Sequence, residues 1–241
     1  MTWLDCDAAD FFTQPVPTSE VQDELPPGFV ATDLPGAWGM SGPDPPLTPL
    51  LFTARQCGNS TIGANVTGAF VFFSWAFFVR PPARFQNESI ASNASVWHIT
   101  PHPAIADVFA AWGIGGLGNV SIEKAQLVGG VEQQRAVAMY DNVSYEFTSA
   151  CPPVGYPTQQ SPDQEGDVSR AFGVRNRLLG GVVTFTALNT QGGTAGEGDY
   201  AMLGAEGVHG AHPNGRAAVS CGLEPFTSQE IRLAVPPERN R

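Results

Sequence analysis

Short apolar stretches, separated by polar residues, glycine and proline, recur along most of the chain. Apolar runs of this length between turn residues are typical of β-strands. They predict strands at 50–57, 95–100, 120–128, 131–140, 143–149, 171–175, 181–188, 201–205 and 217–221. Two stretches rich in turn residues and small side chains, 152–167 and 190–198, are expected to be mobile surface loops.

The stretch 69–80 differs from the other predicted strands because both of its alternating faces are apolar. One face carries Phe70, Phe72 and Phe78, and the other carries Phe73, Trp75 and Phe77. A strand with two apolar faces must be covered on both sides. We therefore predict a central strand here.

One helix is predicted at 103–112. Its apolar residues fall at helical spacing and are Ile105, Val108, Phe109 and Trp112. Pro103 suits the first turn, and Gly113 follows the end of the helix. A shorter helix begins near Thr18 or Ser19 and must stop at the prolines at 26 and 27.

The composition supports one mostly β domain over residues 1–241, with its core at about 10–235. Gly (27 residues) and Pro (21 residues) are frequent, which suits short strands and disfavours long helices. Apolar residues make up 42% of the chain and charged residues only 15%, so it can bury a sizeable core. No internal repeat of 20 to 50 residues is visible, which disfavours a propeller or solenoid.

The charge excludes some partners. The formal net charge is -11, and Lys124 is the only lysine. No basic stripe is present to neutralise phosphates, so neither nucleic acid nor an anionic membrane surface is an expected partner. The longest apolar run, 69–79, is far shorter than the roughly 20 residues of a spanning helix, so no membrane insertion is expected.

Several features point to an extracellular protein. Six of the ten asparagines begin an N-glycosylation sequon, namely Asn59, Asn65, Asn87, Asn93, Asn119 and Asn142. The four cysteines are Cys6, Cys57, Cys151 and Cys221, with no CxxC pair. Two disulfides are the simplest interpretation, with three possible connectivities, and four free thiols are the alternative. We predict a secreted glycoprotein, whose signal peptide, not visible here, has been removed or precedes the sequence.

The order of these elements, together with the helix stop at 25–29 (Leu-Pro-Pro-Gly-Phe), resembles the acetoacetate decarboxylase-like superfamily. The resemblance runs from about Asp10 to Val235. It implies a cone-like, mostly antiparallel β-barrel that encloses a pocket, with a few short helices outside. The decarboxylases use a lysine activated by a second, adjacent lysine to form a Schiff base. Because this chain has a single lysine, the resemblance implies a divergent member that lacks the catalytic lysine pair, and the decarboxylase chemistry is not transferred.

Three polar residues are candidates for a site inside such a barrel. Arg55 shares its strand face with apolar neighbours and could anchor a carboxylate. His98 and Glu146 could supply acid or base groups, although Glu146 could equally be a buried salt-bridge partner of Arg55. Phe72, Trp75 and Trp97 are expected to line the ligand pocket, with either Trp97 or its neighbour His98 facing it.

Metal and cofactor sites are not expected. The histidine pairs 98/102 and 209/212 have helical spacing, but prolines and a glycine-rich turn keep each pair from sharing one helical face. Gly113, Gly115 and Gly118 match a dinucleotide-binding pattern, but they follow a helix instead of opening one.

Three classes of function remain open from the sequence. The leading one is a protein that binds a small, largely apolar or carboxylate-bearing ligand without Schiff-base decarboxylation. The second is a lyase, cyclase or hydrolase that uses Arg55, His98 and Glu146. The third is an extracellular structural glycoprotein with a filled core.

Overall fold

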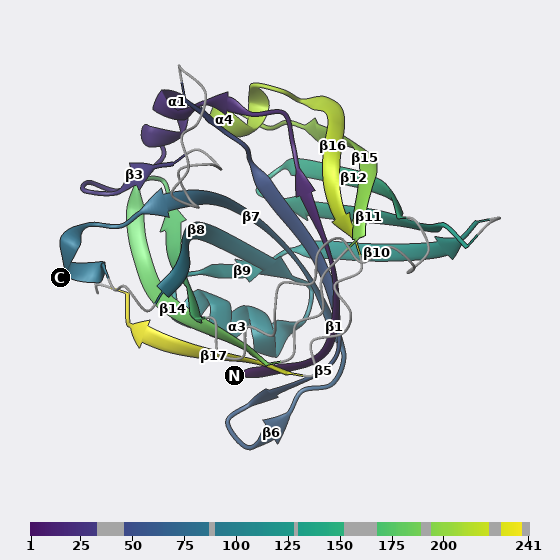
Figure 1. The fold of residues 1–241 in the computed structure, drawn as a ribbon. Helices are drawn as coiled ribbons and strands as arrows, with labels where there is room; N and C mark the ends of the chain where they lie inside the picture. The colour runs from purple at the N-terminus through teal and green to yellow at the C-terminus, as the bar shows by residue number, and fades with distance from the viewer. Residues whose placement is uncertain are drawn as a thin grey trace.

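The computed structural model describes residues 1–32, 46–86, 90–127, 130–151, 168–188, 194–221 and 228–237. It is mostly β, and its large sheet curls into a ring (Figure 1). The long strands are β1 (Thr2–Phe12), β5 (Leu51–Ile62), β7 (Phe70–Arg80), β8 (Ile90–Thr100), β10 (Asn119–Gln126), β11 (Glu132–Tyr140), β12 (Val143–Cys151), β13 (Val168–Arg175), β14 (Leu178–Leu188), β15 (Thr194–Leu203), β16 (Asn214–Cys221) and β17 (Ser228–Val235).

Short elements connect and cover these strands. The short strands are β2 (Val16–Pro17), β3 (Val30–Ala31), β4 (Leu47–Thr48), β6 (Asn65–Val66) and β9 (Gly115–Leu117). The helices are α1 (Thr18–Gln22), the 3₁₀ turn η1 (Ala83–Phe85), α3 (Pro103–Ala111) and α4 (Gly207–Gly210). No helix within the described ranges has the length and apolar character that crossing a bilayer requires.

Seven strands close into a barrel in the order β1, β5, β7, β8, β13, β14, β17 and back to β1. All of these neighbours are antiparallel except β8 and β13, which run parallel. The barrel-like, mostly antiparallel architecture expected from the sequence is therefore confirmed. Closing the ring pairs the edges of the sheet, which removes exposed hydrogen-bonding groups.

A second layer branches from β1. Strand β1 pairs with β17 at Thr2 and Trp3, but with β16 from Ala9 to Phe12. From β16 the layer continues through β15, β12 and β11 to β10. One long strand therefore belongs to the barrel at its start and to the second layer at its end.

The two faces of the barrel wall bury different cores. The outward face packs against the second layer, where Phe52 and Phe73 meet Phe147. The inward face packs against α3 through Phe72 and Phe109, and all seven ring strands contribute buried residues to this core. The helix therefore closes the interior of the barrel, as the ribbon also shows (Figure 1). Strand β7 has both faces covered, as its sequence predicts.

The cysteines form disulfides. Cys6 on β1 is bonded to Cys57 on β5, 51 residues apart in sequence and opposite each other in the strand register. Cys151 is also disulfide-bonded, whereas the side chain of Cys221 lies outside the described residues. No free cysteine occurs in the described part of the chain, which makes free thiols the wrong alternative there.

Each strand predicted from the sequence is present, and so is the helix at 103–112, which buries Ile105 and Phe109. Of the long strands, β1 and β17 were not predicted, and neither were the five short strands. The predicted loop at 190–198 is wrong from residue 194 onward, because β15 begins there and pairs with both β12 and β16. The predicted loop at 152–167 lies outside the described residues.

Most of the described sequon asparagines are at least partly exposed. Asn65, Asn119 and Asn142 are exposed, and Asn59 and Asn93 are half-buried. Asn87 lies outside the described residues. None of the five described side chains is fully buried, so the fold leaves room for the glycans that the sequence predicts.

Candidate ligand-binding site

Two of the three candidate polar residues come together inside the barrel. Arg55 projects from β5 into the interior, and His98 projects from β8 close enough for its pKa to respond to the Arg55 charge. The acidic partner is Asp10 on β1 and not Glu146. The Thr53 hydroxyl donates a hydrogen bond of 2.6 Å to the Asp10 carboxylate.

The electrostatics of this interior group follow from its burial. Removal from water raises the pKa of Asp10 and lowers the pKa of Arg55, and the attraction between the two charges offsets part of each shift. Burial, together with the nearby positive charge of Arg55, lowers the pKa of His98 to about 3. His98 is therefore neutral at any physiological pH.

Aromatic rings surround this interior group. The Arg55 guanidinium lies 5.8 Å from the centre of the Trp3 ring and 5.5 Å from that of Phe72, within cation–π range. The His98 ring lies 5.6 Å from Phe72 and 5.2 Å from Phe109. Both His98 nitrogens are buried and have no hydrogen-bond partner among the described residues. The histidine is thus held mainly by ring packing.

The remaining predicted site residues lie elsewhere. Glu146 stands on the exposed outer face of the second layer, where it accepts a hydrogen bond of 2.8 Å from Arg135. Phe72 faces the barrel interior, whereas Trp75 faces the second layer and stacks on Tyr145. Trp97 faces away from the barrel interior and lines a separate cavity beside the barrel. Of the pair Trp97 and His98, the tryptophan is the one that meets this cavity.

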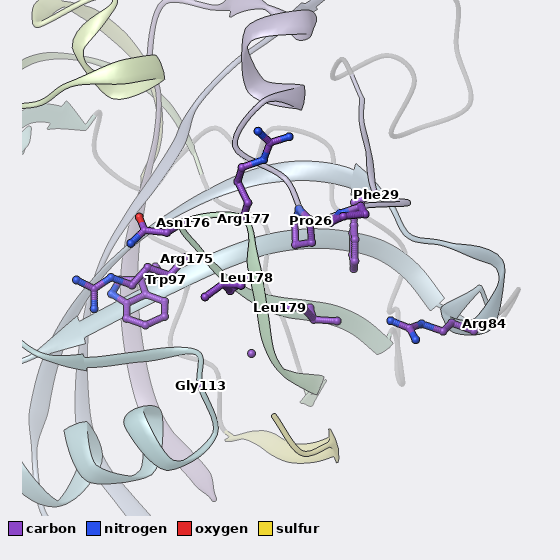
Figure 2. A pocket seen from close by; sticks show the side chains of 12 residues that line it. Pro26, Phe29, Arg84, Trp97, Gly113, Arg175, Asn176, Arg177, Leu178 and Leu179 are labelled. Atoms are coloured by element: carbon purple, nitrogen blue, oxygen red, sulfur yellow. The ribbon is translucent and has the colours of Figure 1, made fainter. Parts of the chain in front are cut away.

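That cavity has a volume of about 610 Å³ and lies beside the barrel (Figure 2). Five segments build it, namely the loop after α1, η1, β8, the turn after α3 and the β13–β14 hairpin. Its described lining residues are Pro26, Pro27, Phe29, Arg84, Trp97, Gly113, Arg175, Asn176, Arg177, Leu178, Leu179 and Gly180. The volume is in the range typical of small-molecule sites.

The base of the hairpin is fixed against the end of α3 by close backbone contact. A side chain at Gly180 would place its Cβ 2.0 Å from the carbonyl oxygen of Gly113, so only glycine fits. The hydrogen bond from the Gly181 amide to the Trp112 carbonyl, 2.8 Å long, joins the same two segments. The walls of the cavity are therefore anchored to the barrel.

The charge of the lining is unusual for this chain. Three of its twelve described lining residues are arginines, and none is a carboxylate, although the chain holds 23 acidic residues against 12 basic ones. In Figure 2, Arg175 and Arg84 lie at opposite ends of an apolar row that contains Trp97, Leu178 and Leu179. The cavity thus combines an apolar floor with positive charge at its rim.

The three arginines differ in what holds them. Arg175 pairs with Asp141, and its guanidinium lies 5.2 Å from the ring centres of both Trp97 and Tyr140. Arg84 lies 4.7 Å from the centre of the Phe85 ring. Within the described ranges, neither Arg84 nor Arg177 has an acidic partner. Two cations are therefore available to an anion in this cavity.

Sequence reasoning found only Trp97 of this lining. The rest of the cavity depends on long-range contacts between loops, which no local pattern encodes. One signal was present, because Arg175, Asn176 and Arg177 form the turn between two predicted strands, and functional residues concentrate in such loops.

Lys124, the single lysine, lies on β10 and is 3.4 Å from the Glu132 carboxylate. It lines neither the cavity nor the barrel interior. No cluster of three or more potential metal ligands occurs in the part of the chain that the structure describes.

A scan against protein-family models finds no match for this chain, and a search of curated proteins finds no matching sequence. The geometry of the barrel and of its cavity therefore carries the functional argument.

Proposed function

We propose that this protein is a secreted glycoprotein that binds a small organic carboxylate with an apolar body in the cavity beside its barrel. The observation that carries the proposal is the charge of the lining, with three arginines and no described carboxylate in a chain of net charge -11. Chance placement of charged residues in so acidic a chain favours the opposite sign. Guanidinium groups bind carboxylates through paired, charge-assisted hydrogen bonds.

The apolar part of the ligand would contact Phe29, Trp97 and Leu179. Trp97 is 8% exposed and is held by packing, so it offers a rigid wall at a low entropic cost. A carboxylate at one end of such a ligand would face an arginine at the rim. This arrangement matches the usual small-molecule site, which has mostly apolar walls and a few polar groups that orient the ligand.

The position of the amine supports binding without decarboxylation. Schiff-base chemistry requires a neutral lysine in contact with the substrate, and its activation requires burial or a neighbouring cation. Lys124 lies on the edge strand β10 and faces the Glu132 carboxylate of β11 instead. The acetoacetate decarboxylase-like resemblance would then extend to the barrel shape but not to the chemistry.

The test is calorimetric titration with phenylpropionate and, as a neutral counterpart, phenylpropanamide. We expect the carboxylate to bind at least about tenfold more tightly, since hydrogen bonds to charged groups are worth about 1.5–3 kcal/mol. Arg84→Gln should weaken carboxylate binding. Arg216→Gln removes the same charge on the outer face, where Arg216 pairs with Glu197 and Asp199, and should leave binding unchanged. Equal binding of the acid and the amide would refute the proposal.

Secretion and glycosylation are tested separately. The protein expressed through a eukaryotic secretory pathway should lose mass on enzymatic deglycosylation. An unchanged intact mass would remove the glycoprotein part of the proposal and leave ligand binding to be judged on its own.

A further inference from the structure

Two hairpin turns beside the cavity share a rare backbone conformation. The non-glycine residues with positive φ in the described chain are Asp141 (47°) and Asn142 (66°) between β11 and β12, and Asn176 (50°) and Arg177 (63°) between β13 and β14. Two consecutive positive φ values define the type I′ hairpin turn, which matches the twist of its strands. The pair Arg175 and Asp141 joins the two turns.

Three of these four residues suit the left-handed conformation, and one does not. Asn and Asp tolerate positive φ because their short polar side chains bond to the local backbone. Arginine has no such compensation, and the second turn position is where glycine is preferred. Arg177 therefore occupies a position that costs stability, and residues kept in such conformations cluster at binding and catalytic sites.

The strained turn places Arg177 at the edge of the cavity. Arg177 lines the cavity, and it makes no ion pair or ring contact with any described residue. Arg175, two positions earlier, is already neutralised by Asp141 and enclosed by two rings. In Figure 2 Arg84 and Arg177 lie on different sides of the cavity, with the Arg84 side chain directed toward the apolar row and the Arg177 side chain extending from the hairpin turn away from it. Arg175 positions the hairpin, so Arg177 is the arginine of this turn whose charge is left for a ligand.

We infer that Arg177 is the residue that determines specificity, because it binds the ligand carboxylate and sets the preference for acids over their neutral analogues. This inference rests on the proposed function. It adds that Arg177 alone provides most of the preference for acids over their neutral analogues. The summed electrostatic field of the three arginines provides the smaller part. A field effect would be spread over Arg84, Arg175 and Arg177 and would depend weakly on the shape of the anion.

The test compares Arg177→Gly and Arg177→Asn with the native protein. Both replacements suit positive φ, so the melting temperature should stay the same or rise, by about 2–4 °C for Arg177→Gly. The tenfold or greater preference for phenylpropionate over phenylpropanamide should fall to less than about threefold. Arg177→Lys should keep part of the affinity but lose the paired geometry of the guanidinium.

The matched control is Asn142→Gly in the other hairpin, measured on deglycosylated protein because the change also removes a sequon. It should stabilise the same type of turn and leave the ligand preference intact. Full acid preference in a folded Arg177→Gly variant would overturn the inference while the proposed function stands. A lower melting temperature in both Arg177 variants would overturn it too, since Arg177 would then be structural. Absence of any acid preference in the native protein would instead refute the proposed function itself.

Discussion

The barrel interior and the cavity beside it both combine arginine with aromatic rings. They differ in whether the protein itself supplies a negative charge to balance the arginine. Inside the barrel, Arg55 faces the Asp10 carboxylate and the Trp3 and Phe72 rings. In the cavity, Arg84 and Arg177 have no described acidic partner. The interior is compensated from within, whereas the cavity has charge left for a ligand.

This difference separates the structural role of a charge from its binding role. A charge that the protein itself neutralises contributes to stability, and its removal leaves the partner unsatisfied. A charge that the protein leaves exposed at a concave rim contributes little to stability and is available to a ligand. Substitutions in the barrel interior should therefore change mainly the stability of the protein. Substitutions in the cavity should change mainly ligand binding.

The largest effect is expected at Arg55. Arg55→Met should lower the free energy of unfolding by about 2–3 kcal/mol, because it leaves the Asp10 carboxylate inside the barrel without its cation. The double variant Arg55→Met/Asp10→Asn should recover part of this loss. Urea unfolding measures both. Arg216→Met, at an exposed and paired arginine, should cost less than about 1 kcal/mol.

The same variant tests whether the ligand binds in the cavity or inside the barrel. Phenylpropionate binding should survive in folded Arg55→Met. If binding disappeared while the unfolding transition stayed cooperative, the ligand site would lie inside the barrel, and the alternative of an enzyme that uses Arg55 and His98 would become the leading one.

The next effect concerns acid stability. The pKa values of His98, about 3, and His209, about 4, lie below the 6.5 of an unfolded histidine because both rings are buried. The unfolded chain therefore binds more protons below pH 6.5, and the stability that each neutral histidine provides is lost as pH falls from 6.5 toward those values. Each can contribute up to about 1.4 kcal/mol per pH unit. Asp10, with its raised pKa, acts in the opposite direction, since its contribution is lost as pH rises above 3.8.

We expect His98→Phe to flatten the acid branch of the stability curve, because the aromatic packing remains and the titrating group is gone. Urea unfolding at several pH values between 7 and 4.5 measures the slope. His212→Gln serves as the control, since His212 makes no ring contact in the described part of the chain. An unchanged slope in His98→Phe would show that His98 does not govern acid unfolding.

Most of the long strands could be predicted because their apolar residues alternate or form short runs, as in β7. Helix α3 could be predicted because its apolar residues recur at helical spacing. Strand β1 was missed because aspartates at 5, 7 and 10 interrupt its apolar residues. Its alternation is real, with Ala9 and Phe11 on the outward face and Asp10 inside. A carboxylate that points into a barrel breaks the pattern by which strands are recognised.

Within the interior group, the orientation of Arg55 could be predicted from the sequence, but its acidic partner could not. The strand parity of Arg55 indicated that it faces the interior, since parity is a local property. Its acidic partner was assigned to Glu146, but the register of β11 against β12 brings Glu146 beside Arg135 on the outer face. Partners and cavities depend on which strands become neighbours, and a single sequence does not specify that.

A smaller effect is expected where the two hairpins meet. Asp141→Asn keeps a residue that tolerates positive φ but removes the charge that pairs with Arg175. Both side chains are exposed by about half, so the loss of stability should be less than about 1 kcal/mol. Ligand binding should become about two- to fivefold tighter, because Arg175 then adds its charge to the cavity. Asp199→Asn, beside Arg216, is the control that should not change calorimetric affinity. Weaker binding would mean that the pair is needed to hold the hairpin in place.

The smallest effect on stability is expected at Arg84. Arg84→Gln should change the free energy of unfolding by less than about 0.5 kcal/mol, since the side chain is exposed and has no described acidic partner. Its contribution should appear in the salt dependence of binding instead. Raising the salt concentration from about 0.05 M to about 0.5 M shortens the range of charge interactions and should weaken phenylpropionate binding to the native protein. The weakening should be smaller in Arg84→Gln, because one screened attraction is already gone. Titration at three salt concentrations, with Arg216→Gln as the charge-matched control, measures the two slopes, and equal slopes would mean that Arg84 does not act on the ligand.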